Sequence, residues 1–114
     1  MRLTDFCLKM PIKLLILDVL KPHEPGIIDM ARTISGLKGI SGCNLAVVEI
    51  DRKVENVKIT IEGTDINFED IREIIEKAGA TIHSIDEVAA GAKTVREIRT
   101  PQDTQQGGGP KFLR

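Results

Sequence analysis

Seven polar residues of this chain could bind a ligand, and they gather around a loop that follows a strongly apolar segment. The loop reads KPHEPG at residues 21–26, and both histidines of the chain belong to the group. The members are Asp18, Lys21, His23, Glu24, Asp51, Glu55 and His83. Their side chains allow two binding chemistries, one for anions and one for cations.

The first chemistry is an anion or small-molecule site in the loop itself. Lys21 and His23 can carry positive charge, and a helix that begins after the loop presents free backbone N–H groups. Together these groups could hold a carboxylate or a phosphate. Lys21 and His23 are therefore the candidate ligand-binding residues.

The second chemistry is a metal site. Carboxylate oxygens suit a hard cation such as Ca²⁺ or Mg²⁺, whereas imidazole nitrogen favours a transition metal. The candidate metal ligands are Asp18, Glu24, Asp51, Glu55 and His83. Their spacing does not follow the calcium loop of an EF-hand. A purely structural role, at strand ends, in a helix cap and on an edge strand, therefore stays open beside both chemistries.

Several functions are excluded by what the chain lacks. Aromatic residues make up 3% of the chain, and the predicted central strands have none on which an RNA-recognition domain could stack bases. A soft-metal chaperone with this chain order would have two cysteines where KPHEPG stands. No Ser–His–Asp, Cys–His or HExxH spacing predicts a catalytic centre. A net charge of −1 gives no attraction to nucleic acid or to an anionic membrane.

Apolar periodicity predicts the elements that position these residues. Strands are expected at about 12–20, 43–51, 54–62 and 81–88, with helices at about 27–34 and 68–78. The order β-α-β-β-α-β with right-handed crossovers predicts a ferredoxin-like α+β fold. Its antiparallel sheet has the spatial order 4-1-3-2, and both helices lie on one face. This topology places all seven candidates at one end of the sheet.

The first predicted strand suggests self-association. Residues 12–20 read IKLLILDVL and are apolar on both faces, yet the helices can cover only one. The other face should be covered by a second subunit or a ligand. The alternative is that the two chain ends fold across it, but the C-terminal end is too polar to serve as a lid.

The domain is expected at residues 11–97. Residues 1–10 are interpreted as a leader or an alternative start, and residues 98–114 as a disordered tail, because Gln, Gly and Pro dominate it. The only cysteines, Cys7 and Cys43, predict reduced thiols, and no apolar run is long enough to span a bilayer. A cytoplasmic protein is expected.

Three segments resemble a known family. DVLKPHEP at residues 18–25, EIDRKVENVKITIEG at 49–63 and HSIDEV at 83–88 are similar to an archaeal family of uncharacterised proteins, domain of unknown function 211. The resemblance covers about residues 11–95. It implies a ferredoxin-like fold and assembly into closed homo-oligomeric rings, and it allows bound calcium. It implies no enzymatic activity.

Together these features predict a homo-oligomeric binding or regulatory module, with a divalent cation or a small ligand near the loop after the first strand. Two alternatives stay open. One is a small enzyme whose site forms between subunits, and the other is a purely structural ring scaffold. Neither nucleic acid nor a membrane is expected as a partner.

Overall fold

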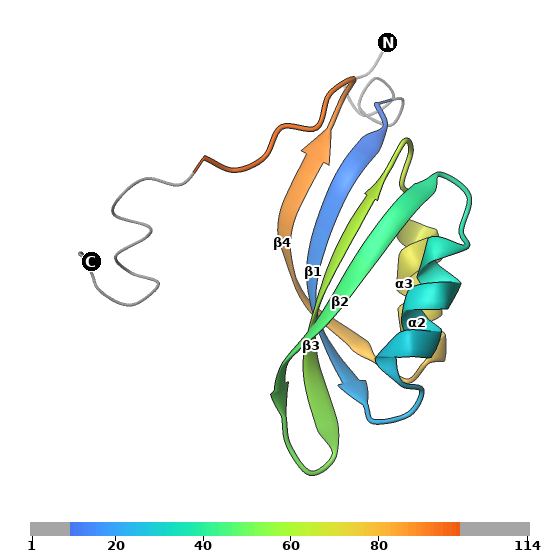
Figure 1. Ribbon diagram of the computed structural model, residues 1–114, viewed down its shortest axis with the longest axis vertical. Helices are drawn as coiled ribbons and strands as arrows, with labels where there is room; N and C mark the ends of the chain where they lie inside the picture. Colours follow the sequence, from blue (N-terminus) through green and yellow to red (C-terminus); the bar gives the residue numbers. More distant parts are fainter. Residues whose placement is uncertain (1–9, 99–114) are drawn as a thin grey trace, which may run out of the picture.

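The computed structural model describes residues 10–98, which form one antiparallel sheet with two helices on one face (Figure 1). The elements are β1 Ile12–Pro22, α2 Ile27–Ser35, β2 Ile40–Ile50, β3 Val54–Gly63, α3 Phe68–Lys77 and β4 Thr81–Ala90. The sheet order β2-β3-β1-β4 is the predicted order 4-1-3-2 read from the other edge. The predicted ferredoxin-like α+β fold is therefore confirmed. The proposed leader and tail lie, apart from Met10 and Ile98, outside the described residues.

The main core lies between the sheet and the helices. Alternate side chains of a strand point to the same face of a sheet, so Leu15, Leu17 and Val19 of β1 all point toward the helices. The helix residues that meet the sheet recur at the spacing of an amphipathic helix. They are Met30 and Ile34 of α2 and Ile71 and Ile75 of α3.

The ends of α3 follow from local chemistry. Asn67 is the N-cap, and its side chain accepts a hydrogen bond of 3.2 Å from the backbone N–H of Asp70. This bond satisfies one of the N–H groups that a helix start leaves without a partner. The chain turns away after the helix at Gly79, whose φ of +81° is unfavourable for a side chain.

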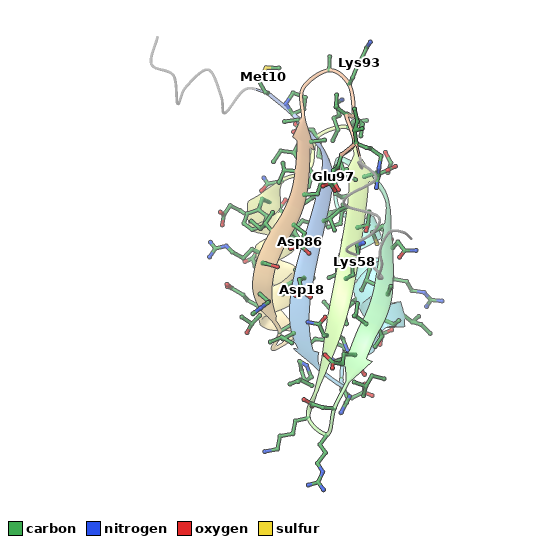
Figure 2. The ribbon with its side chains drawn as sticks, turned by 90° about the vertical axis from the view of Figure 1, so that its left-hand side faces the viewer. Met10, Asp18, Lys58, Asp86, Lys93 and Glu97 are labelled. Carbon is green, nitrogen blue, oxygen red and sulfur yellow. The ribbon has the colours of Figure 1, made fainter. Side chains whose placement is uncertain are left out.

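The face of the sheet opposite the helices is called the open face here (Figure 2). It is not a bare apolar surface, because Leu14 and Ile16 are 0% and 5% exposed and form a small second cluster with Ala89. The polar residues Asp18 and Lys58 lie next to one another further along the same face.

Residues after β4 return toward the open face. The Arg96 guanidinium lies 3.5 Å from Glu62, and the Glu97 N–H donates to Glu87. Because Glu62 is paired with Leu14 in the sheet and Glu87 with Ile16, these contacts flank the small cluster on both sides. Leu14 and Ile16 are therefore buried without a second subunit. The apolar second face of β1 is then no longer an argument for self-association.

The β2–β3 hairpin extends beyond the helices and beyond the end of β1 (Figure 1). We call residues 48–56 the arm. Asp51 organises its turn, because the Asp51 carboxylate accepts hydrogen bonds of 3.0 Å from the N–H groups of Lys53 and Val54. No helix covers the arm, and two of its apolar side chains, Val48 and Ile50, are each 64% exposed.

Gly39 and Gly63 allow two backbone segments to touch near the other end of this hairpin. Gly39 has a φ of +86°. A Cβ on Gly63 would collide with the carbonyl oxygen of Gly39 and lie 3.0 Å from the Cα of Ile40. This close approach lets the Gly39 carbonyl accept a hydrogen bond from Thr64.

Neither α2 nor α3 has the length and apolar character that crossing a bilayer requires, so residues 10–98 contain no candidate membrane span.

Candidate functional site

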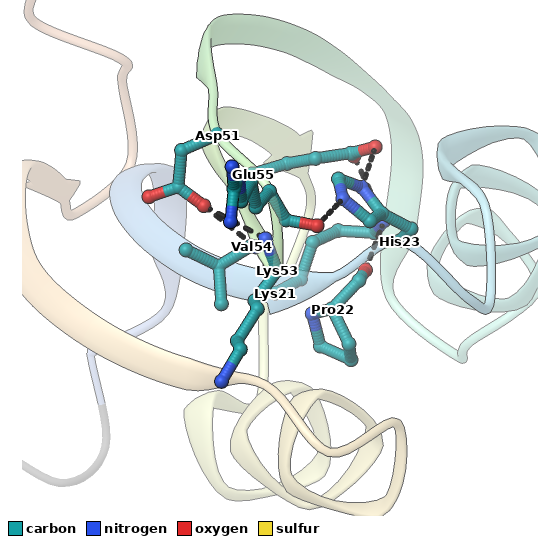
Figure 3. Close-up of polar contacts among 8 residues, drawn as sticks. Lys21, Pro22, His23, Asp51, Lys53, Val54 and Glu55 are labelled. Atoms are coloured by element: carbon teal, nitrogen blue, oxygen red, sulfur yellow. Dashed lines mark hydrogen bonds and ion pairs between the residues drawn. The ribbon is translucent and has the colours of Figure 1, made fainter.

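Lys21 and Glu55 form the centre of the candidate site (Figure 3). They are paired across β1 and β3, and Lys21 follows Val19 by two residues, so it points to the helix side of the sheet. Its side chain is 0% exposed. The ammonium group donates to Glu55 Oε1 at 3.0 Å and to the Pro22 carbonyl at 2.8 Å. Burial of this charge is tolerated because a carboxylate faces it.

His23 binds the other carboxylate oxygen of Glu55. His23 Nδ1 lies 3.1 Å from Glu55 Oε2, and Nε2 lies 2.9 Å from the carbonyl oxygen of Arg52. Both neighbours are acceptors, so both ring nitrogens must carry a proton for both bonds to form. The geometry therefore favours the imidazolium ion.

The electrostatics agree with this geometry. The Glu55 hydrogen bond, followed by the bond to the Arg52 carbonyl, raises the pKa of His23 above its ordinary value. In turn, the hydrogen bonds from His23 and then Lys21 lower the pKa of Glu55. Glu55 is therefore ionised and shared by two cations.

Asp51 completes the group from the turn of the arm. The backbone N–H groups of Val54 and Lys53 lower its pKa, with a smaller contribution from the nearby charge of His23. Asp51 Oδ1 accepts both of these hydrogen bonds, so it is already engaged within the turn. The structure thus brings together four of the predicted residues: Lys21, His23, Asp51 and Glu55.

Asp18 is not at the end of the sheet, and the prediction that placed it there was wrong. β1 continues past Asp18 to Pro22, so Asp18 lies within the strand, paired with Lys58 and Ser84 on the open face (Figure 2). Asp86 is nearby on β4, where it accepts a 2.7 Å hydrogen bond from Ser84. Asp18 thus belongs to a different surface from Glu55.

Glu24 and His83 are exposed, each in an irregular part of the backbone. Glu24 lies in the loop between β1 and α2. His83 is skipped by the β1–β4 pairing, since Asp18 pairs with Ser84 and Val19 with Ile82. His83 therefore lies in a β-bulge, where the regular pairing of the two strands is interrupted.

No three His, Cys, Asp or Glu side chains within residues 10–98 are grouped as a metal site would require. Both oxygens of Glu55 are engaged by cations, and Lys21 has no exposed surface. What this arrangement can do chemically is hold the loop after β1 to the arm. Room for a small molecule lies beside Asp51, in a hollow of about 200 Å³ lined by Leu20, Glu49, Ile50, Asp51, Val54 and Asn56. A second hollow of about 320 Å³ lies elsewhere, lined by Ser41, Gly42, Cys43, Asn44, Thr60 and Glu62.

Sequence reasoning missed the apolar residues at the edges of the sheet. Val47, Val48 and Ile50 on β2 and Ile85 and Val88 on β4 are all partly or largely exposed. A signal was present on β2, where Val47 and Val48 are adjacent and so break the alternation of a half-buried strand.

The element order, the antiparallel sheet and the single helix layer define a ferredoxin-like α+β domain. At residues 13–104 the sequence matches the family DUF211, described as uncharacterized ArCR. The chain is also 58% identical over 92 residues to an uncharacterized protein of Methanocaldococcus jannaschii, with 81% of this chain and 95% of that protein covered. The chain therefore belongs to the DUF211 family, as its motifs predicted.

Proposed function

We propose that this protein is a homo-oligomeric binding or regulatory module rather than an enzyme. One observation carries the proposal: apolar side chains are exposed at both edges of the sheet. Val48 and Ile50 are 64% exposed on β2, and Ile85 and Val88 are 51% exposed on β4. Apolar patches that remain in water on a single chain are typical of protein–protein contact surfaces.

The polar candidates support a role without catalysis. Lys21, His23 and Glu55 satisfy one another's charges, so this group offers neither a free base nor a free nucleophile. Catalytic side chains must reach a substrate, whereas these three residues tie two backbone segments together. The alternative of an enzyme site between subunits has no specific contact in its favour.

The ligand and the ring remain predictions. Ca²⁺ or Mg²⁺ at Glu55, or an anion at Lys21 and His23, would have to displace the existing ion pairs. A ligand that binds only the folded chain raises its melting temperature. Thermal shifts with millimolar Ca²⁺, Mg²⁺ and phosphate test both chemistries. Glu55→Gln and Lys21→Ala are the matching variants for the candidate site, and Asp18→Asn is the variant for the separate surface that holds Asp18.

Sedimentation equilibrium at micromolar concentration tests the assembly. We expect a species several times heavier than the 12.5 kDa chain. Native mass spectrometry of protein purified without added metal then gives the number of subunits and the mass of any bound ion. A single 12.5 kDa species across the concentration range would contradict the proposal.

A further inference from the structure

We propose that the subunits join head to tail, with the β2 edge and arm of one copy packed along the β4 edge of the next. This inference rests on the proposed function for the existence of an assembly, and it adds which surfaces meet. The partner at each edge is a second copy of this chain.

The exposed apolar residues of β2 lie on the helix side of the sheet. Val47 is paired with Val57, which is a core residue beneath the helices. Ile50 is paired with Glu55. Glu55 is in turn paired with Lys21, whose side chain points to the helix side of the sheet. Paired residues share a face, so Val47 and Ile50 form an apolar strip on that side, where the helices do not reach the arm (Figure 1).

The exposed apolar residues of β4 lie on the same side. Ile85 is paired with Leu17 and Val88 with Leu15, and both leucines belong to the main core. Ile85 and Val88 therefore lie on the helix side of the opposite edge strand, outside the main core, and each is 51% exposed. If β4 of one copy lay beside β2 of another, the two apolar strips would share one face. Val47 is level with Ile82 and not with Ile85 or Val88, so the second copy must also be shifted along the strands for the strips to meet.

Strand direction favours this arrangement. All three pairings within the sheet are antiparallel, and the order is β2-β3-β1-β4. The two edge strands therefore run in opposite directions. A second copy placed beside the first in the same orientation continues the alternation without inverting the molecule, and its helices stay on the same side.

The exposed charges favour a contact between the β2 edge of one copy and the β4 edge of another over a contact between two β4 edges. The turn of the arm carries the exposed residues Arg52 and Lys53, whereas Asp86 and Glu87 lie on β4. Within residues 10–98 none of these four side chains forms an ion pair. A contact between two β4 edges would bring like charges together and is disfavoured. A contact between the arm and β4 brings opposite charges together and covers both apolar strips.

A mixing experiment separates head-to-tail assembly from a two-fold contact. One variant, Val47→Lys/Ile50→Lys, loses the β2 surface, and the other, Ile85→Lys/Val88→Lys, loses the β4 surface. Each should sediment as a monomer alone. An equimolar mixture should form a complex of twice the subunit mass, because the intact β2 edge of one variant meets the intact β4 edge of the other.

Ile28→Lys is the matched control, because Ile28 is 68% exposed and lies on α2 and not on either edge strand. It should assemble like the unmodified chain. Circular dichroism checks folding, and serine replaces lysine in any variant that unfolds. A dimer of the β4 variant alone would show a two-fold β2 contact and overturn the inference. Retention of the wild-type size by either variant would also overturn it, while the proposed assembly would stand.

Discussion

His23 and Glu55 are 32 residues apart in the sequence, yet Nδ1 of His23 lies 3.1 Å from Oε2 of Glu55. The same ring reaches the Arg52 carbonyl at 2.9 Å. The loop after β1 is therefore fixed to the arm through one ionised carboxylate and one protonated ring. Loss of the ring proton would leave one of these two contacts without its donor.

The first prediction concerns this pair and pH. The pKa of His23 is raised in the folded chain, so its contribution to stability is complete below the ordinary value of 6.5 and is lost as pH rises through the raised value. The pKa of Glu55 is lowered, so its contribution is complete above 4.5 and is lost as pH falls through the lowered value. The pair should therefore stabilise the fold fully between about pH 4.5 and 6.5.

A titration followed by NMR measures the ring directly. Glu55→Gln should lower the midpoint of the His23 signal, and the His83 signal serves as an internal control in the same sample. Glu49→Gln, a change of the same kind on the exposed part of β2, should leave the His23 midpoint in place. An unchanged midpoint in Glu55→Gln would mean that the ion pair does not form in solution.

The second prediction ranks two changes at the buried ion pair. Glu55→Gln leaves the Lys21 ammonium buried with the Pro22 carbonyl as its remaining partner, whereas Lys21→Met removes the buried charge and leaves Glu55 with His23. Leaving a buried charge unpaired costs more than replacing it with an apolar group. Urea unfolding at pH 6 should therefore show a lower midpoint for Glu55→Gln than for Lys21→Met. Adding Lys21→Met to Glu55→Gln should recover part of the loss, and a further drop would contradict this explanation.

The predicted fold was correct because its signals are local. The alternation of Val57, Ile59 and Ile61 identifies β3, and Asn67 identifies the start of α3 before any contact is known. The candidate site was predicted only in part, because the residue at which a strand ends depends on pairing with residues far away in the sequence. Lys21 resembles a loop residue in the sequence, and only its pairing with Glu55 shows that β1 continues and that Asp18 lies within the strand.

The third prediction tests the N-cap of α3. Asn67→Ala removes the side chain that accepts from the Asp70 N–H, and the loss of such a cap costs about 1 kcal/mol of unfolding free energy. Asn67→Asp preserves an acceptor at the same position and should cost much less. Chemical denaturation of the three proteins measures the difference. Equal stability of the alanine and aspartate variants would show that the hydrogen bond contributes nothing.

The fourth prediction compares two glycines of the β2–β3 hairpin. Gly63→Ala would press a methyl group against the Gly39 carbonyl, which is backbone and cannot turn aside, whereas a Cβ at Gly42 meets nothing within 4 Å. Overpacking of this kind costs about 1–3 kcal/mol. Gly63→Ala should lower the melting temperature, and Gly42→Ala should leave it unchanged or slightly raised. A similar effect at both positions would mean that the close approach of Gly39 and Gly63 relaxes easily.

The arm should be a site of local opening of the backbone in an isolated subunit. No helix covers it, so its β2–β3 backbone bonds can separate without disturbing the main core, and such segments open at far lower free energy than the whole domain. Deuterium should therefore enter the amides of residues 48–54 early in a free chain. If a neighbouring copy packs along the arm, those amides should exchange slowly. Their exchange rate then distinguishes a monomer from a subunit within an assembly.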